Sequence, residues 1–231
     1  MASSPALRAV VFDLDGTLLD HRRSTRAGLT RWLAQYDQAW TDEIERAWFH
    51  AEEEHFGAWR RGEISHTEQR RRRLRDFLPA VGHPVGDDDA LDAVFREYLA
   101  AYQASWVGFG DVDAALDEVA ARGLATAVLT NGTRELQEAK LAALGVLDRI
   151  GPVLCAAEIG VAKPHPDAFA AVCDRLGLPA ASVLYVGDEH AVDIVGARAA
   201  GLRAVLIDRG QAEPVEEDAR ISSLPALAEW L

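Results

Sequence analysis

The chain has 231 residues, of which 49% are hydrophobic and 26% charged, so it is long enough to bury a sizeable core. Its formal net charge of −13 disfavours binding to a nucleic-acid backbone or to an anionic membrane. No apolar run approaches the ~20 residues of a membrane span, and the first residues do not resemble a signal peptide. Cys155 and Cys173 lie in apolar surroundings and are expected to be buried thiols. We therefore expect a cytoplasmic protein.

The first predicted element is a buried strand at 9–12, an apolar run rich in β-branched and aromatic residues. It stops at Asp13 and Asp15, which are followed by Gly16. Asp-Gly is common in turns, so these residues alone also fit a simple loop. In an open α/β sheet, however, ligands bind at the carboxyl ends of the strands. Two carboxylates this close repel each other unless a cation holds them, and a hard divalent ion such as Mg²⁺ is expected.

The next segment, 21–106, shows helical periodicity in four stretches. Helices are predicted over 22–38 and 41–60, from Ser65 or Thr67 onward, and over 88–104. This segment has 13 arginines and 15 acidic residues, a balance of −2, whereas the rest of the chain has a balance of −11. Because no strand is predicted within it, we expect a second domain inserted after the first strand.

From Gly108 onward, predicted strands and helices alternate, with a loop expected at 210–218. In chain order they are a helix at 111–122, a strand at 124–129, a helix at 134–144, a weaker strand at 153–156, a helix at 166–176, a strand at 182–186, a helix at 191–200, a strand at 203–207 and a helix at 224–231. The alternation predicts a doubly wound parallel α/β sheet. The expected domains are a catalytic core of 1–20 with 108–231, and a helical domain of 21–107.

Polar residues follow the predicted strands after the first one as well. They are Thr130 and Asn131, Lys163, and Asp188 with Glu189 and Asp193. Because the carboxyl ends of parallel strands lie at one edge of a sheet, these groups are expected to converge with the first two aspartates. Carboxylates for a metal, a hydroxyl and a lysine together form a set suited to handling phosphate.

This pattern resembles the haloacid dehalogenase (HAD) superfamily, most of whose members are phosphatases. Asp13-Leu14-Asp15-Gly16-Thr17 is similar to its first motif, Thr130-Asn131 to the second, Lys163-Pro164 to the third, and Gly187-Asp188-Glu189 with Asp193 to the fourth. The helical segment is similar in position to the α-helical cap of that family. The resemblance implies a Rossmann-like core with an inserted cap.

The resemblance also implies roles for these residues. Asp13 would attack phosphorus to form an aspartyl-phosphate, and Asp15 would protonate the leaving oxygen and later deprotonate water. Mg²⁺ would bind the Asp13 carboxylate, the Asp15 backbone carbonyl and Asp188, supported by Asp193. Phosphoryl oxygens would be bound by Thr130, Asn131 and Lys163, with Lys163 also pairing the nucleophile. The expected reaction is Mg²⁺-dependent hydrolysis of a small phosphorylated metabolite.

Each later residue also has a simpler interpretation. Thr130 and Asp188 are common at strand ends and helix caps, and Asp193 fits a solvated helix face. Glu189 is better explained as a structural or outer-sphere group than as a metal ligand. Lys163 has firmer support, because the chain has only two lysines against 22 arginines, and a compact ammonium suits a phosphate site.

The residues also bear on other activities. Asp15 favours phosphoryl transfer over dehalogenation, because a dehalogenase has no ester oxygen to protonate. The segment 21–106 contains no lysine, which disfavours a phosphonatase that needs an imine. A sugar phosphomutase remains open, as does, from another class, a non-catalytic phosphate-binding or phospho-receiver protein. The sequence leaves monomer and homodimer open, and it places the expected hinges at 20–22 and 107–110.

Overall fold

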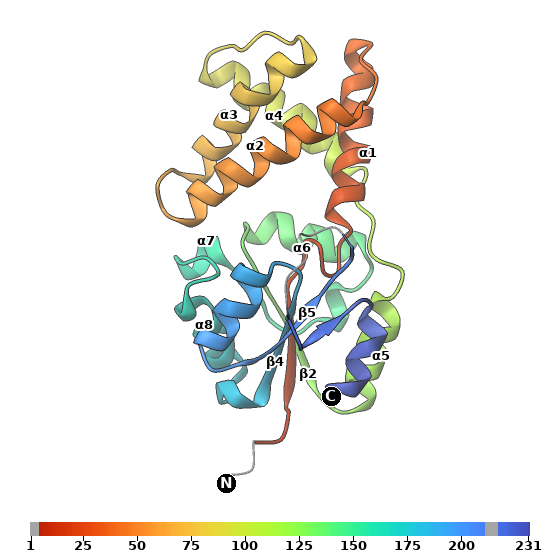
Figure 1. The fold of residues 1–231 in the computed structure, drawn as a ribbon, viewed down its shortest axis with the longest axis vertical. Coiled ribbons are helices and arrows are strands. Elements are labelled where there is room, and N and C mark those ends of the chain that lie inside the picture. Colours follow the sequence, from red (N-terminus) through yellow and green to blue (C-terminus); the bar gives the residue numbers. More distant parts are fainter. Residues whose placement is uncertain (1–4, 211–216) are drawn as a thin grey trace. The chain divides into compact units, whose positions relative to one another are not determined.

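The chain forms two compact units (Figure 1). The computed structural model describes residues 5–210 and 217–231. One unit contains the chain up to His21 and from Val107 onward, and the other is Arg22–Trp106. No helix in the described ranges is both long enough and apolar enough to cross a membrane.

A six-stranded parallel sheet forms the centre of the first unit. Its strand order is β3-β2-β1-β4-β5-β6. The strands are β1 (Ala9–Phe12), β2 (Ala125–Thr130), β3 (Val153–Cys155), β4 (Val183–Gly187), β5 (Arg203–Ile207) and β6 (Arg220–Ile221). β1 lies between β2 and β4, and Phe12 is opposite Val128 and Val186. The last residue of β1 is therefore at the middle of the sheet, and the predicted doubly wound α/β fold is confirmed.

Helices cover both faces of this sheet (Figure 1). On one face, alternate strand residues such as Val11 and Tyr185 pack in one cluster with Phe169 of α8 (Pro166–Leu176). The same cluster includes Ala197 of α9 (Val195–Ala199). The other face is covered by α5 (Val112–Ala121), which contacts β2 and the C-terminal 3₁₀ segment Leu224–Glu229. The strands, buried from both sides, are accordingly almost entirely apolar.

The second unit contains α1 (His21–Leu33) from its second residue, α2 (Asp42–Arg60), α3 (His66–Phe77) and α4 (Asp88–Gln103). α2, α3 and α4 begin after N-cap side chains that accept backbone N–H groups, namely Thr41, Ser65 and Asp87. Trp32, Trp48 and Phe77 are fully buried in its core. The helix predicted over 22–38 stops earlier, because Ala34–Tyr36 forms a 3₁₀ turn with Asp37 in the left-handed region.

Short elements account for most differences from the predicted pattern. The predicted helix at 191–200 is a π-helical turn, His190–Ile194, followed by α9, and the predicted C-terminal helix is a 3₁₀ segment. β6 was not predicted, and most of the predicted loop at 210–218 lies outside the described residues. The remaining elements are α6 (Arg134–Ala143), α7 (Ala156–Ile159), and the 3₁₀ turns Leu78–Val81, Leu147–Arg149 and Ala180–Ser182.

Candidate functional site

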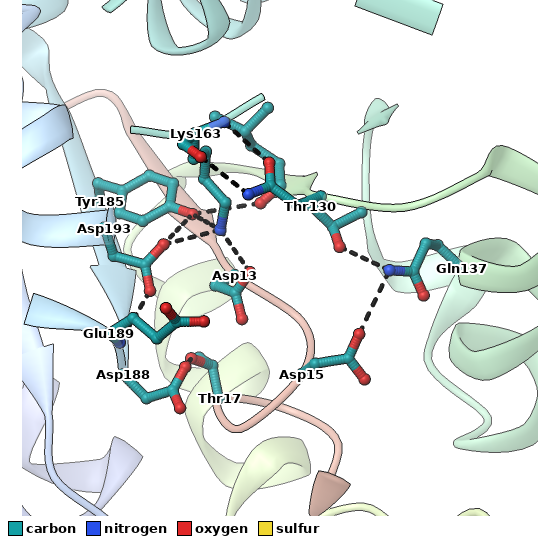
Figure 2. Close-up of polar contacts among 12 residues, drawn as sticks. Asp13, Asp15, Thr17, Thr130, Gln137, Lys163, Tyr185, Asp188, Glu189 and Asp193 are labelled. Atoms are coloured by element: carbon teal, nitrogen blue, oxygen red, sulfur yellow. Dashed lines mark hydrogen bonds and ion pairs between the residues drawn. The ribbon is translucent and has the colours of Figure 1, made fainter. Parts of the chain in front are cut away.

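The predicted site residues gather at the carboxyl edge of the sheet (Figure 2). Asp13 follows β1, and Thr130 is the last residue of β2. Lys163 lies on the segment after α7, and Asp188 follows β4. Parallel strands whose carboxyl ends share one edge produce this convergence from residues up to 175 positions apart.

Lys163 is the central cation of the site, with only 2% of its surface exposed. Its Nζ donates to Asp13 Oδ1 at 2.5 Å, to Asp193 Oδ1 at 2.7 Å and to the hydroxyl of Tyr185 at 2.8 Å. Burial lowers the pKa of Lys163, but the carboxylates of Asp13 and Asp193 outweigh it and raise that pKa well above the ordinary value. The ammonium is therefore permanently charged at neutral pH.

Asn131 fastens the segment that carries this lysine. Its Nδ2 donates to the backbone carbonyl of Lys163 at 3.0 Å, and its Oδ1 accepts from the backbone N–H of Lys163 at 2.8 Å. Both polar atoms of the side chain are thus engaged with one residue. Asn131 is well placed to orient Lys163, while phosphate binding by its side chain stays a prediction.

Three carboxylates cluster beside this lysine. One oxygen each from Asp13, Asp188 and Asp193 lie within 4.8 Å of one another. Burial raises the pKa of Asp13 to about 7, even though Lys163 lowers it. Burial, together with Asp13, Asp193 and Glu189, raises the pKa of Asp188 well above its ordinary value. Three acidic groups thus face one ammonium, an imbalance that a hard divalent cation with oxygen ligands would remove.

Two glycines make room for these carboxylates. Gly16 has a φ of +90°, and a Cβ on it would lie 2.1 Å from Asp188 Oδ2. A Cβ on Gly187 would lie 2.4 Å from Asp193 Cγ. Asp193 is buried rather than solvated, and its Oδ2 accepts the backbone N–H of Glu189 at 3.0 Å. The backbone of the first and fourth motifs is therefore shaped around these acidic side chains.

Asp15 belongs to a second set of contacts, on the side of α6. Lys140 Nζ lies 2.7 Å from both of its carboxylate oxygens, and Gln137 Nε2 lies 3.3 Å from Oδ2. His21 Nδ1 lies 3.7 Å from Oδ1. Burial raises the pKa of Asp15, but the charges of Lys140 and His21 outweigh it and lower that pKa below its ordinary value. The two aspartates of the first motif thus have opposite electrostatic surroundings.

Sequence reasoning did not identify Gln137, Lys140 or Tyr185 as parts of the site. Tyr185 lies within an apolar strand and is indistinguishable there from a core aromatic residue. One feature of the sequence could have identified Lys140: it is the other of the two lysines in an arginine-rich chain. Gln137 precedes it by three residues, which places both on one face of a helix.

The chain is similar to several known proteins. A family model described as haloacid dehalogenase-like hydrolase matches residues 7–201. A phosphatase of Mycobacterium tuberculosis is 33% identical over 217 residues, covering 88% of each chain. The phosphoserine phosphatase of Thermus thermophilus is 37% identical over 142 residues, which are 61% of this chain and 55% of that protein.

Among solved structures, YfnB of Bacillus subtilis, described as a HAD-hydrolase bound to magnesium, has a TM-score of 0.80. The alignment covers 98% of this chain and 99% of that one, at 20% sequence identity. At this identity the likeness concerns the fold alone.

Proposed function

Because the chain belongs to the haloacid dehalogenase-like hydrolases, we propose that it is a Mg²⁺-dependent phosphatase acting on a small phosphate monoester. Phosphatases are among its relatives, which supports a phosphoric monoester hydrolase. The observation that carries the proposal is the surroundings of Asp13: this buried carboxylate is bound by Lys163, adjoins two further carboxylates, and has an acid two residues away. Such a set fits phosphoryl transfer to an aspartate.

In this reaction the Asp13 carboxylate attacks phosphorus, and the bond from phosphorus to the leaving oxygen breaks. Lys163 orients the nucleophile by donating to Asp13 Oδ1, and its positive charge offsets negative charge as the phosphoryl group approaches. Asp15 donates a proton to the leaving oxygen and later removes one from the water that hydrolyses the aspartyl-phosphate. Thr130 donates its hydroxyl hydrogen to a phosphoryl oxygen.

The residues present fit a magnesium ion. Asp13 and Asp188 would hold it with the backbone carbonyl of Asp15, and Asp193 would support the site through Lys163 and the backbone of Glu189. All of these are oxygen donors, which Mg²⁺ prefers, and they carry the excess negative charge described above. When bound, the ion supplies neutralisation of the charge shared by nucleophile and phosphoryl group.

The helical unit is inferred to be the substrate-selecting cap. Its place in the chain, immediately after the first motif, supports this role. The unit contains no lysine, so an imine-forming reaction with an aldehyde substrate is disfavoured. The proposed substrate class is therefore a small phosphorylated metabolite with an ordinary P–O ester bond.

Phosphate release from a panel of small esters, with Mg²⁺ and with EDTA, tests this function. The wild type should release phosphate only with Mg²⁺, and Asp13→Asn should lower kcat by at least ~10³-fold because the nucleophile is lost. Asp174→Asn is a matched control, since it removes one carboxylate from the exposed face of α8. No release from any ester by the wild type would refute the phosphatase. Phosphate trapped on Asp13 without turnover would instead indicate a mutase.

A further inference from the structure

The strongest unassigned contact at the site is made by a helix outside the four motifs. Lys140 lies on α6, has only 4% of its surface exposed, and contacts both oxygens of Asp15 at 2.7 Å. A two-oxygen contact of this kind restrains rotation of the carboxyl group as well as its position. A lysine is costly to bury, so its placement against the reacting acid calls for an explanation beyond stability.

Gln137, one helical turn before Lys140, extends the contact to the phosphate-binding residue. Its Nε2 donates to Asp15 Oδ2 at 3.3 Å and to Thr130 Oγ1 at 2.7 Å (Figure 2). Gly132 accommodates it, since a Cβ there would lie 2.5 Å from Gln137 Nε2. Because Thr130 Oγ1 accepts this hydrogen bond, its own hydroxyl hydrogen is left to donate to another acceptor.

We propose that Lys140, together with Gln137, is a positioning residue for the general acid Asp15, so that α6 sets the geometry of leaving-group protonation. The inference rests on the proposed phosphatase function and adds a determinant to it. A general acid must lie within hydrogen-bond reach of the leaving oxygen, and a carboxylate on a glycine-flanked loop needs an external restraint to stay there. Lys140 supplies that restraint from a rigid helix.

Lys140 faces Asp15 while Asp15 transfers a proton to the leaving oxygen. Asp15 reacts from its protonated form, which the charges of Lys140 and His21 make the minor form at neutral pH. It gives its proton to the leaving oxygen while the bond from that oxygen to phosphorus breaks and the bond from Asp13 to phosphorus forms. The negative charge that appears on Asp15 then faces the ammonium of Lys140, which keeps its own three protons. Lys140 thus acts through Asp15.

This role predicts dependence on the leaving group. An alkyl alkoxide is a poor leaving group and needs protonation, whereas p-nitrophenolate leaves without it. Lys140→Met should therefore lower kcat/KM for an alkyl phosphate by about 10- to 100-fold, and for p-nitrophenyl phosphate by less than about 3-fold. Because kcat/KM reports phosphoryl transfer to Asp13, the later hydrolysis of the intermediate does not obscure the comparison. Lys140→Arg should recover part of the alkyl-phosphate activity.

Arg134→Met is the matched control, because it removes one positive charge from the exposed face of the same helix. It should leave the ratio of the two kcat/KM values unchanged. Equal losses on both substrates in a folded Lys140→Met protein, or no loss on either, would overturn the positioning role. If Lys140→Met does not fold, Lys140→Gln decides by the same ratio. Absence of any phosphate release by the wild type would instead refute the proposed function, and this inference with it.

Discussion

Each of the two lysines of the chain faces one aspartate of the first motif. Lys163 faces Asp13 and Asp193, and Lys140 faces Asp15, and both are almost completely buried. A compact ammonium can approach several carboxylate oxygens within a small space, whereas a guanidinium is larger and planar. The rarity of lysine in an arginine-rich chain is thus associated with its use at both acidic groups of the first motif.

Removal of Lys163 tests how strongly it compensates the buried acids. In EDTA, Lys163→Met should lower the free energy of unfolding by about 3 kcal/mol, because it leaves Asp13 and Asp193 buried without their cation. Urea unfolding measures this loss. Tyr185→Phe is the matched comparison, because it removes the neutral hydroxyl that accepts from Lys163 Nζ. It should lower the free energy of unfolding by only about 1 kcal/mol. Equal stability of Lys163→Met and the wild type would contradict the compensating role.

The sequence predicts the site residues that follow strands. It does not identify Gln137 and Lys140, which reach the site from α6, or Tyr185, which lies within β4. Asp13, Thr130 and Asp188 directly follow predicted strands, so the parallel topology brings them together. Lys163 lies farther along the chain from its strand, on a segment that Asn131 holds in place. Gln137 lies on the face of α6 that packs toward the site. Which face of the helix does so depends on tertiary packing, which no local sequence pattern specifies. Residues of this second kind require the folded structure.

At the scale of elements, the sequence predicts a helix boundary well where a single capping interaction determines it. Thr41 caps α2, and Ser65, one of the two starts that the sequence offers, caps α3. The sequence predicts that Asp111 caps α5, and this is wrong, because its carboxylate accepts instead from the Arg209 guanidinium and from the backbone N–H of Leu224. The π-helical turn His190–Ile194 likewise escaped prediction. Such widened turns are frequent at functional sites, and this one carries the buried Asp193.

Within the helical unit, His66 at the start of α3 predicts an acid-sensitive stability. Burial and the nearby Arg70 and Arg73 lower the pKa of His66 from 6.5 to about 4. The unfolded chain therefore binds a proton more readily than the folded one as the pH falls through 6.5, and stability declines toward pH 4. After allowance for solvent screening, His66 should account for about 1 kcal/mol of the loss between about pH 7 and 5.

The measurement is the free energy of unfolding at both pH values for the wild type, His66→Gln and His66→Phe. Comparing the variants with the wild type isolates this histidine from the carboxylates that titrate in the same range. Both variants should show a smaller decline than the wild type. A decline of the same size in all three proteins would mean that His66 is not held in its neutral form.

For the molecule as a whole, the excess negative charge lies in the unit that contains the site. Residues 21–106 have a balance of −2 and the remainder −11. The prediction of a HAD-like phosphatase, made from four short motifs, is confirmed by a family match across residues 7–201 and by phosphatases among the relatives. An acidic protein that handles an anionic substrate depends on a few buried cations, and we therefore expect the proposed Mg²⁺ to contribute to stability as well as to chemistry.

Asp188→Asn tests that dual role. Asp188 is next to Asp13 and Asp193, and its Oδ1 accepts a hydrogen bond from the hydroxyl of Thr17 at 3.4 Å. Its raised pKa means that the folded state binds a proton more readily than the unfolded one, so without metal the carboxylate lowers stability at neutral pH. In EDTA the free energy of unfolding of the variant should therefore be about 1–2 kcal/mol higher than that of the wild type. Added Mg²⁺ should stabilise the wild type and not the variant, as thermal unfolding would show. A variant less stable than the wild type in EDTA would mean that Asp188 stabilises the fold without any ion, and that the acidic cluster is structural.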